Sequence, residues 1–369
     1  MNMRKIIIYS IMMMVIMGCV QKKSPALSDA MSLDEIEAAL AFYPADEYKN
    51  QIERFLIFKS LDSLICFSVK HDSVQLNPDW KERLPQLAAF YRRSVDRGLD
   101  ALENTQVTEG VHVFKFYSSS IILKSKDYTI AIDFAQGPIR NGDEPEKVDA
   151  YNTGFYMTPE QRDRLARLVD MSIITHSHSD HADYSLSHRL VERGKKVIGT
   201  NQLKTLWPAI AHGIIVPVFD TPQTIEGVQI LAQSGFQYST TYRDEDGVLW
   251  GKQSEDKKRD TESIRYLIKF EGKTFLQSGE THDICYDWLQ EAYQKGWKID
   301  VLLSTGMYQG GRDVRQFISD YRVNCLELPI HEYELTHSRG GNRMAHYFKF
   351  ADEVEMRLIK LFWGENIKL

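Results

Sequence analysis

The chain has little cysteine and no excess of positive charge. Its 369 residues include 4 cysteines, no two of which are spaced as Cys-x-x-Cys. A zinc site made of cysteine pairs is therefore not expected, and we expect the cysteines after Cys19 to be buried, inert thiols. Lysine and arginine number 45 against 51 acidic residues, which gives a net charge of -6. No basic stripe is evident, so we expect no nucleic-acid partner.

A long apolar run occurs at the N-terminus. Arg4 and Lys5 precede an almost wholly apolar segment, residues 6–17, which has the form of a secretory signal and is short for a membrane span. It ends in Ile16-Met17-Gly18-Cys19, which resembles the lipobox of bacterial lipoproteins, where the cysteine is acylated after cleavage. We predict a lipoprotein signal peptide over residues 1–19. The protein would then be lipid-anchored and face the periplasm, at the outer membrane rather than the inner one; an ordinary signal peptide or an uncleaved anchor is the alternative.

Helical periodicity dominates the next segment. Ser32 and Glu35 have the spacing of a capping box, and the helix behind them is expected to stop at Pro44. Two further helices are predicted over residues 46–66 and 80–102, the second with Pro85 as a point of interruption. We therefore predict a tether and a small N-terminal helical module over residues 20–108.

From Val111 onward the pattern changes to strands that alternate with helices. Alternating or continuous apolar runs predict strands, and a capping box at Thr158 and Gln161 predicts a helix up to about Val169. The predicted strands are 111–117, 121–124, 128–133, 171–175, 196–200, 228–233, 264–270, 273–276, 301–304 and 325–330. A second helix is predicted over 186–192. This mixture indicates an α+β domain over residues 109–369, and no repeat of fixed period is evident.

Three histidines and an aspartate follow the predicted strand 171–175. His176, His178, Asp180 and His181 lie within one hexapeptide, where His176 and His178 would point the same way. Asp180 and His181 would open the following helix. Neutral imidazole and carboxylate are the ligands that zinc takes, so the hexapeptide predicts a metal site.

The hexapeptide resembles the His-x-His-x-Asp-His signature of the metallo-β-lactamase superfamily, and the resemblance extends from about Val111 to the C-terminus. It implies a four-layer αββα sandwich, with His176 and His178 on one metal and Asp180 and His181 on a second. The strand that ends at Ile132-Asp133, before Gly137-Pro138, also resembles the superfamily's opening strands. Asp133 is accordingly expected to orient the histidine loop, not to bind metal.

Two later motifs resemble the superfamily in part. Where its members carry a Gly-Asp whose carboxylate bridges both metals, this chain has Gly279-Glu280, and Glu280 is one methylene longer. His282 and Asp283 are nearby substitutes. The resemblance also implies that His331, after strand 325–330, is the last ligand of the second metal, with His337 a weaker candidate.

One ligand that the resemblance implies has no obvious counterpart. The third histidine of the first metal should follow the strand near Val228, but residues 232–238 contain none. Gln237 or Ser234 could take its place, although amide oxygen is a poor zinc ligand. Apart from His188 and His212, no histidine lies between the hexapeptide and Glu280, so the first site is expected to be incomplete.

The resemblance implies a metal-dependent hydrolase that uses a metal-bound hydroxide on an ester, lactone or phosphodiester. The chain resembles the branch that includes sugar-phosphate lactonases and N-acyl-phospholipid phosphodiesterases. We expect one or two Zn²⁺ ions, with Mn²⁺ or Fe²⁺ as alternatives, and a small-molecule or lipid-like substrate; Asp180 would be catalytic because it would orient the water as well as bind metal. The alternative is a non-catalytic, lipid-anchored binding protein on a degenerate scaffold.

Two further features leave alternatives open. Arg339 and Arg343 flank Gly340-Gly341 and could hold a substrate anion, or be solvated surface residues. The charged stretch 243–262, with Trp250 as its one large aromatic residue, is either a plain surface loop or a rim over the active site.

Overall fold

A computed structural model defines the architecture. The structure describes residues 27, 31–47, 51–64, 66–70, 73–76, 79–136, 156–178, 180–237, 241–243, 249–251, 261–281, 285–305, 309–330 and 357–369. The predicted signal peptide and its Cys19 lie outside these residues. Within them, no helix is both long enough and apolar enough to cross a membrane.

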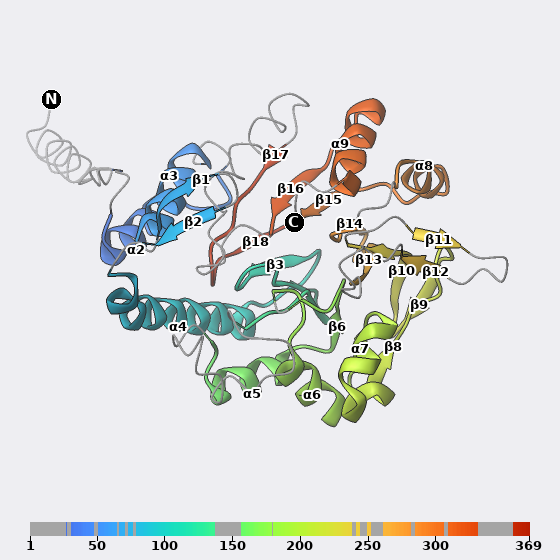
Figure 1. Cartoon of the computed structure of the whole chain (residues 1–369), viewed down its shortest axis with the longest axis horizontal. Coiled ribbons are helices and arrows are strands. Elements are labelled where there is room, and N and C mark those ends of the chain that lie inside the picture. Colours follow the sequence, from blue (N-terminus) through green and yellow to red (C-terminus); the bar gives the residue numbers. More distant parts are fainter. Residues whose placement is uncertain are drawn as a thin grey trace, which may run out of the picture.

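Two seven-stranded sheets make up the centre of the molecule (Figure 1). In spatial order the first contains β18 (Asn366–Lys368), β3 (His112–Lys115), β4 (Ile121–Lys124), β5 (Thr129–Ile132), β6 (Met171–Ile173), β7 (Lys196–Ile198) and β8 (Ile214–Ile215). The second contains β17 (Arg357–Leu358), β16 (Leu326–Pro329), β15 (Val301–Ser304), β14 (Lys273–Gln277), β13 (Glu262–Phe270), β10 (Val228–Phe236) and β9 (Gln223–Ile225).

Both sheets change from antiparallel to parallel pairing partway across. In the first sheet β3, β4 and β5 pair antiparallel, and β5, β6, β7 and β8 then pair parallel. In the second, β10, β13 and β14 pair antiparallel, followed by parallel β14, β15, β16 and β17. Parallel neighbours end at the same edge of a sheet. The loops that follow β5 and β6 are therefore adjacent at one edge of the first sheet, and those that follow β14 and β15 are adjacent at one edge of the second.

Alternating side chains give each sheet two buried faces. Ile121 and Leu123 face the core between the sheets, whereas Ile122 between them belongs to the core under the outer helices. In the second sheet Ile268 faces the inner core and Leu267 the opposite outer core. A strand buried on both faces must be apolar at successive positions. The predicted four-layer αββα sandwich is thereby confirmed.

Helices cover both outer faces. In Figure 1, α4, α5 and α6 lie along the lower side of the strands, and α8 and α9 lie at the upper right. The bounds are α4 (Trp80–Asn104), α5 (Pro159–Leu168), α6 (Tyr184–Glu192), α7 (Asn201–Leu206), η3 (Pro208–Gly213), α8 (Tyr286–Gln294) and α9 (Gln309–Tyr321). The predicted capping box of Thr158 and Gln161 is present at the start of α5.

The N-terminal segment is helical, with one addition. Helix α2 (Leu33–Phe42) has the predicted capping box of Ser32 and Glu35. Helix α3 (Gln51–Ser63) ends earlier than predicted, and a hairpin of β1 (Cys66–Lys70) and β2 (Ser73–Leu76) follows it. Short apolar runs fit helix and strand alike, which is why the sequence concealed this hairpin.

Helix α4 belongs to the same hydrophobic core as the outer face of the first sheet. Pro85 lies inside α4 without interrupting it. Buried residues of the helix, such as Phe90 and Leu99, share one cluster with Phe114 and Ile122 of the sheet. This burial offsets the loss of one backbone hydrogen bond at the proline.

Candidate metal centre

The histidine loop leaves β6 and turns back before the next helix begins. The backbone N–H groups of His181 and Ala182 both donate to the carbonyl of His178, at 2.9 and 2.8 Å. Helix α6 starts only at Tyr184, because the Asp183 carboxylate caps it by accepting from the Leu186 N–H at 2.7 Å. The prediction that Asp180 and His181 open this helix is therefore wrong. Both lie in the turn that precedes it.

The turn gathers the three imidazoles. The ring of His176 lies 4.0 Å from that of His181 and 4.8 Å from that of His178, centroid to centroid. His176 and His181 are fully buried. The loop is held against the second sheet, since the Ile264 N–H donates to the Thr175 carbonyl at 2.9 Å. The histidines therefore lie where the edges of the two sheets meet.

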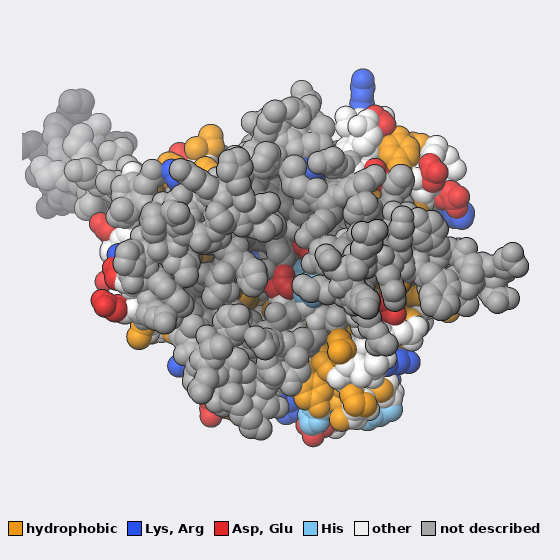
Figure 2. Space-filling model, viewed as in Figure 1, with side chains coloured by type: hydrophobic (Ala, Val, Ile, Leu, Met, Phe, Trp, Pro, Cys, Tyr) orange, Lys and Arg blue, Asp and Glu red, His pale blue; other side chains and the backbone are white. Residues whose placement is uncertain are grey.

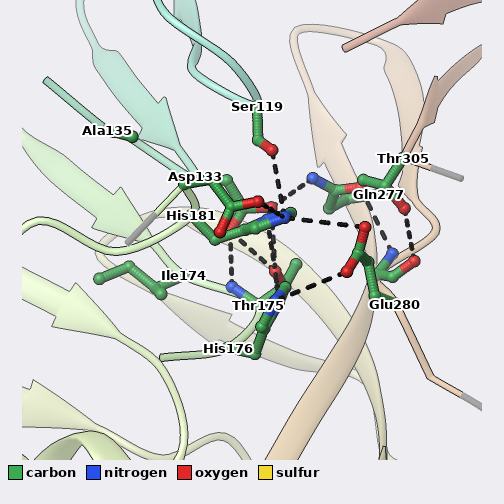
Figure 3. Close-up of polar contacts among 12 residues, drawn as sticks. Ser119, Asp133, Ala135, Ile174, Thr175, His176, His181, Gln277, Glu280 and Thr305 are labelled. Atoms are coloured by element: carbon green, nitrogen blue, oxygen red, sulfur yellow. Dashed lines mark hydrogen bonds and ion pairs between the residues drawn. The ribbon is translucent and has the colours of Figure 1, made fainter. Parts of the chain in front are cut away.

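Glu280 brings a carboxylate from the second sheet to these rings. It follows β14 and is 3% exposed. Its Oε2 lies 3.8 Å from Nε2 of His176, and its Oε1 lies 4.0 Å from Nε2 of His181 (Figure 3). Two atoms bound to one zinc ion at about 2.1 Å each lie at most about 4.2 Å apart. Both pairs meet this condition, so one carboxylate oxygen faces each histidine.

Asp180 lies at the more open side of the cluster. Its Oδ2 is 3.6 Å from Nε2 of His181, and its side chain is 20% exposed. His176, His178 and Asp180 place one possible ligand atom each within 4.8 Å of one another, as do His176, His181 and Glu280. Nitrogen and carboxylate oxygen in this combination suit Zn²⁺, and also Mn²⁺ or Fe²⁺.

Asp133 lies behind the histidines and fixes their orientation. Its Oδ2 is 3.0 Å from Nδ1 of His181, and it also accepts from the Thr175 hydroxyl at 3.0 Å. That hydroxyl lies 3.0 Å from Nδ1 of His176. With Nδ1 held in this way, each ring presents Nε2 to Glu280. The predicted role of Asp133 as an orienting residue agrees with this position.

The carboxylates determine the electrostatics of the site. Burial lowers the pKa of His181, but the charges of Asp180, Asp133 and Glu280 act the other way and leave it above its ordinary value. The cluster therefore attracts positive charge, whether a proton or a metal ion. Acidic and histidine atoms are visible in a hollow near the centre of the face shown in Figure 2.

Several residues of the site were not predicted. Ser119 Oγ lies 3.2 Å from Nε2 of His181 (Figure 3). It belongs to the turn between β3 and β4, where Nζ of the buried Lys115 donates to the Phe116 carbonyl at 2.9 Å and to the carbonyl of Ser118. Gln277 also donates to Asp133 Oδ2 at 2.6 Å. The only sequence feature that could have indicated Ser119 is the run of three serines after the predicted strand 111–117.

The residues considered for the missing third ligand of the first metal differ in their distance from the histidine cluster. Gln237 is 1% exposed, and its Nε2 donates to Oε2 of Glu280 at 2.6 Å. Ser234 lies three residues earlier on β10, in register with Ile264 of β13. His188 pairs with Glu192 on α6 at 3.3 Å, and His212 is exposed in η3. Gln237 is thus the residue that reaches the cluster.

Other predicted residues lie outside the described part of the chain. The strand that should deliver His331 is present as β16, and the Ile330 N–H donates to the Ser304 carbonyl at 3.0 Å. His331 itself is outside the described residues, as are His282, Asp283, His337, Gly137-Pro138, and Arg339 to Arg343. Of the charged stretch 243–262, the structure describes Arg243, residues 261–262, and β12 (Leu249–Gly251), which pairs with β11 (Thr241–Arg243).

No family model and no curated protein matches the chain. Solved structures similar to it include an isothiocyanate hydrolase from Delia radicum gut bacteria, with a TM-score of 0.49 and 15% identity, over 70% of this chain and 98% of that one. A metallo-beta-lactamase fold protein from Bacillus subtilis has a TM-score of 0.44 and 12% identity, over 71% and 100%. CmlA, a diiron beta-hydroxylase from Streptomyces venezuelae, has a TM-score of 0.43 and 11% identity, over 91% and 60%.

Proposed function

We propose that this chain is a metal-dependent hydrolase of an ester, lactone or phosphodiester bond in a small or lipid-like molecule. One observation carries the proposal: the two oxygens of Glu280 face Nε2 of His176 and of His181, at 3.8 and 4.0 Å. These atoms come from loops of different sheets, and one or two cations held between them account for their convergence.

The residues present fit a divalent metal. His181 is held by the Asp133 carboxylate and His176 by the Thr175 hydroxyl, which is the arrangement that keeps a ligating nitrogen deprotonated. His176, His178, Asp180, His181 and Glu280 would hold one or two ions. A bound ion of this kind would lower the pKa of a coordinated water to about 7 and so supply hydroxide at neutral pH.

Asp180 is the residue that we assign to the reacting water. Its partial exposure, 20%, places its carboxylate at the boundary between the buried histidines and solvent. From there it can accept a hydrogen bond from a water beside His181 and direct the lone pair of that water toward the substrate. Ser119, whose Oγ lies 3.2 Å from His181 Nε2, can donate a hydrogen bond to an oxygen at the same place.

Asp180→Ala tests the assignment. Zinc-loaded full-length protein would be assayed against nitrophenyl esters, bis(nitrophenyl) phosphate and a set of lactones. We expect kcat to fall at least about 100-fold for any substrate that the wild type turns over. Asp287→Ala, at an exposed position of α8, is the control and should keep full turnover. Unchanged turnover in Asp180→Ala would show that another centre performs the reaction.

The second candidate is a non-catalytic binding protein, which is favoured by the uncharged Gln237 beside Glu280. The two functions differ in a simple measurement. A hydrolase retains zinc, determined by mass spectrometry of the purified protein, and turns over at least one member of the substrate panel. A protein that retains no zinc at micromolar zinc concentration, and turns over nothing, is the binding protein.

A further inference from the structure

Gln237 lies beside the proposed metal centre at the end of β10. Its backbone N–H donates to the Thr261 carbonyl at 3.0 Å, and the Thr261 hydroxyl lies 3.3 Å from Nε2 of His178. Its own Nε2 donates to Glu280 Oε2 at 2.6 Å, and this is the oxygen that faces His176. The amide therefore lies on the side of the centre that His176 and His178 form.

The amide is only half satisfied. Gln237 Oε1 is buried and has no hydrogen-bond partner among the described residues. A buried carbonyl oxygen without a donor is rare and needs a reason. Its other end cannot bind a cation, because the Nε2 group that faces Glu280 carries two protons and its lone pair is delocalised into the carbonyl group. Whichever way the amide is turned, it offers a cation at most one neutral oxygen.

The two halves of the centre differ in the charge that supports them. In the half formed by His181, this histidine lies 3.0 Å from the Asp133 carboxylate and 3.6 Å from that of Asp180. In the half formed by His176 and His178, the ring of His176 lies against the hydroxyl of Thr175. A carboxylate behind a ligating imidazole raises its basicity more than a neutral hydroxyl does. The His181 half should therefore bind a cation more tightly.

We propose that Gln237 limits this protein to one firmly bound zinc ion, by placing an amide where an imidazole would complete the ligands of the His176–His178 half. The inference rests on the proposed metal centre but not on its catalysis. Zinc prefers imidazole nitrogen to amide oxygen. An imidazole at this position, next to Glu280 and His176, would therefore create a second firm site.

Gln237→His is the test. Full-length protein would be stripped with a chelator, loaded with excess zinc and passed through metal-free buffer, and the zinc retained per chain would be measured by mass spectrometry. We expect one equivalent for the wild type and two for Gln237→His. Gln86→His adds a histidine at an exposed position of α4 and should retain one equivalent. Competition with a chromophoric chelator should show the second ion of Gln237→His bound at least about tenfold more tightly than any second ion of the wild type.

Each other result counts against the inference. A wild type that retains two equivalents, or a folded Gln237→His that retains one, overturns it. If Gln237→His does not fold, as judged by circular dichroism, Gln237→Glu replaces it in the test because its side chain offers a charged oxygen. Two equivalents of zinc retained by Gln237→Glu support the inference, and one equivalent overturns it. His181→Ala distinguishes failure of this inference from failure of the proposed function. If His181→Ala retains as much zinc as the wild type, the proposed metal centre is wrong. If the wild type retains one equivalent but turns over no substrate, only the proposed hydrolase activity is wrong.

Discussion

Nδ1 of His181 lies 3.0 Å from Oδ2 of Asp133, and neither side chain is exposed to solvent. The pair joins the loop after β5 to the loop after β6, which are adjacent because β5 and β6 pair in parallel. It also fixes the tautomer of His181, so that Nε2 is the nitrogen left to bind a metal. The geometry of the centre thus depends on a residue that holds a proposed ligand in place but is not itself expected to bind the metal.

Asp133→Asn should weaken zinc binding. An amide keeps the hydrogen bond but lacks the charge that raises the basicity of the His181 ring, so we expect the affinity to fall about 10–100-fold. The dissociation constant would be measured by competition with a chromophoric chelator. Asp127→Asn, exposed in the turn before β5, is the control. An affinity equal to that of the wild type would mean that Asp133 does not support the metal ligand.

Leu99→Ala should destabilise the whole protein. Leu99 is fully buried where α4 meets the first sheet, and removal of a buried leucine side chain lowers the free energy of unfolding by about 2–5 kcal/mol. Urea unfolding would measure the change. Leu206→Ala, 51% exposed on α7, should change it by less than about 0.5 kcal/mol. If Leu99→Ala had as small an effect, α4 would not belong to the core that supports the sandwich.

Glu327→Gln should change how stability depends on pH. Burial raises the pKa of Glu327, an effect that exceeds the lowering by Arg315, whose Nη2 lies 3.2 Å away. A carboxyl whose pKa is raised in the folded state stabilises the fold fully below its unfolded pKa, and this stabilisation is lost as the pH rises through the folded value.

Glutamine stays neutral at every pH, so the Tm of the wild type should fall relative to that of Glu327→Gln as the pH rises above 4.5, the ordinary pKa of a glutamate. Thermal unfolding at a series of pH values would measure this difference. Parallel Tm curves for the two proteins would show that the buried carboxyl does not titrate differently on folding.

We propose that Cys19 carries a lipid anchor, on the strength of the sequence Ile16-Met17-Gly18-Cys19. Cys19→Ser removes the thiol that would be acylated, so the protein should leave the membrane fraction and lose incorporation of labelled palmitate. Lys22→Ser, in the predicted tether, should change neither result. Persistent membrane association of Cys19→Ser would exclude an anchor at this cysteine.

The sequence was most informative where the ligands are contiguous or directly follow a strand. His176, His178 and Asp180 stand two residues apart, and no tertiary information is needed to see that they lie close together. Glu280 was recognisable because it follows the predicted strand 273–276 at the place where the resemblance implies a metal-binding aspartate. The alternation of Ile121, Ile122 and Leu123 between two cores is a local property of strands, whereas the four layers of the fold were predicted from the resemblance.

Other features depended on pairs of residues far apart in the chain. The bond from Gln277 to Asp133 spans 144 positions, and no local pattern indicates it. Likewise, the proximity of Ser119 to His181 depends on how a buried turn is held by Lys115. The start of α6 at Tyr184 was missed because Asp180 and Asp183 are equally suitable N-cap residues by type, and only the structure shows that Asp183 is the one that caps the helix.

The sequence by itself therefore determined which residue types can bind a metal and which strands carry them, because side-chain chemistry and strand periodicity are local. Only the tertiary structure decided that one oxygen of Glu280 faces His176 and the other His181, and that the amide of Gln237 lies beside them. These relations depend on how two sheets meet at one edge, which is fixed by packing of the cores between and outside them.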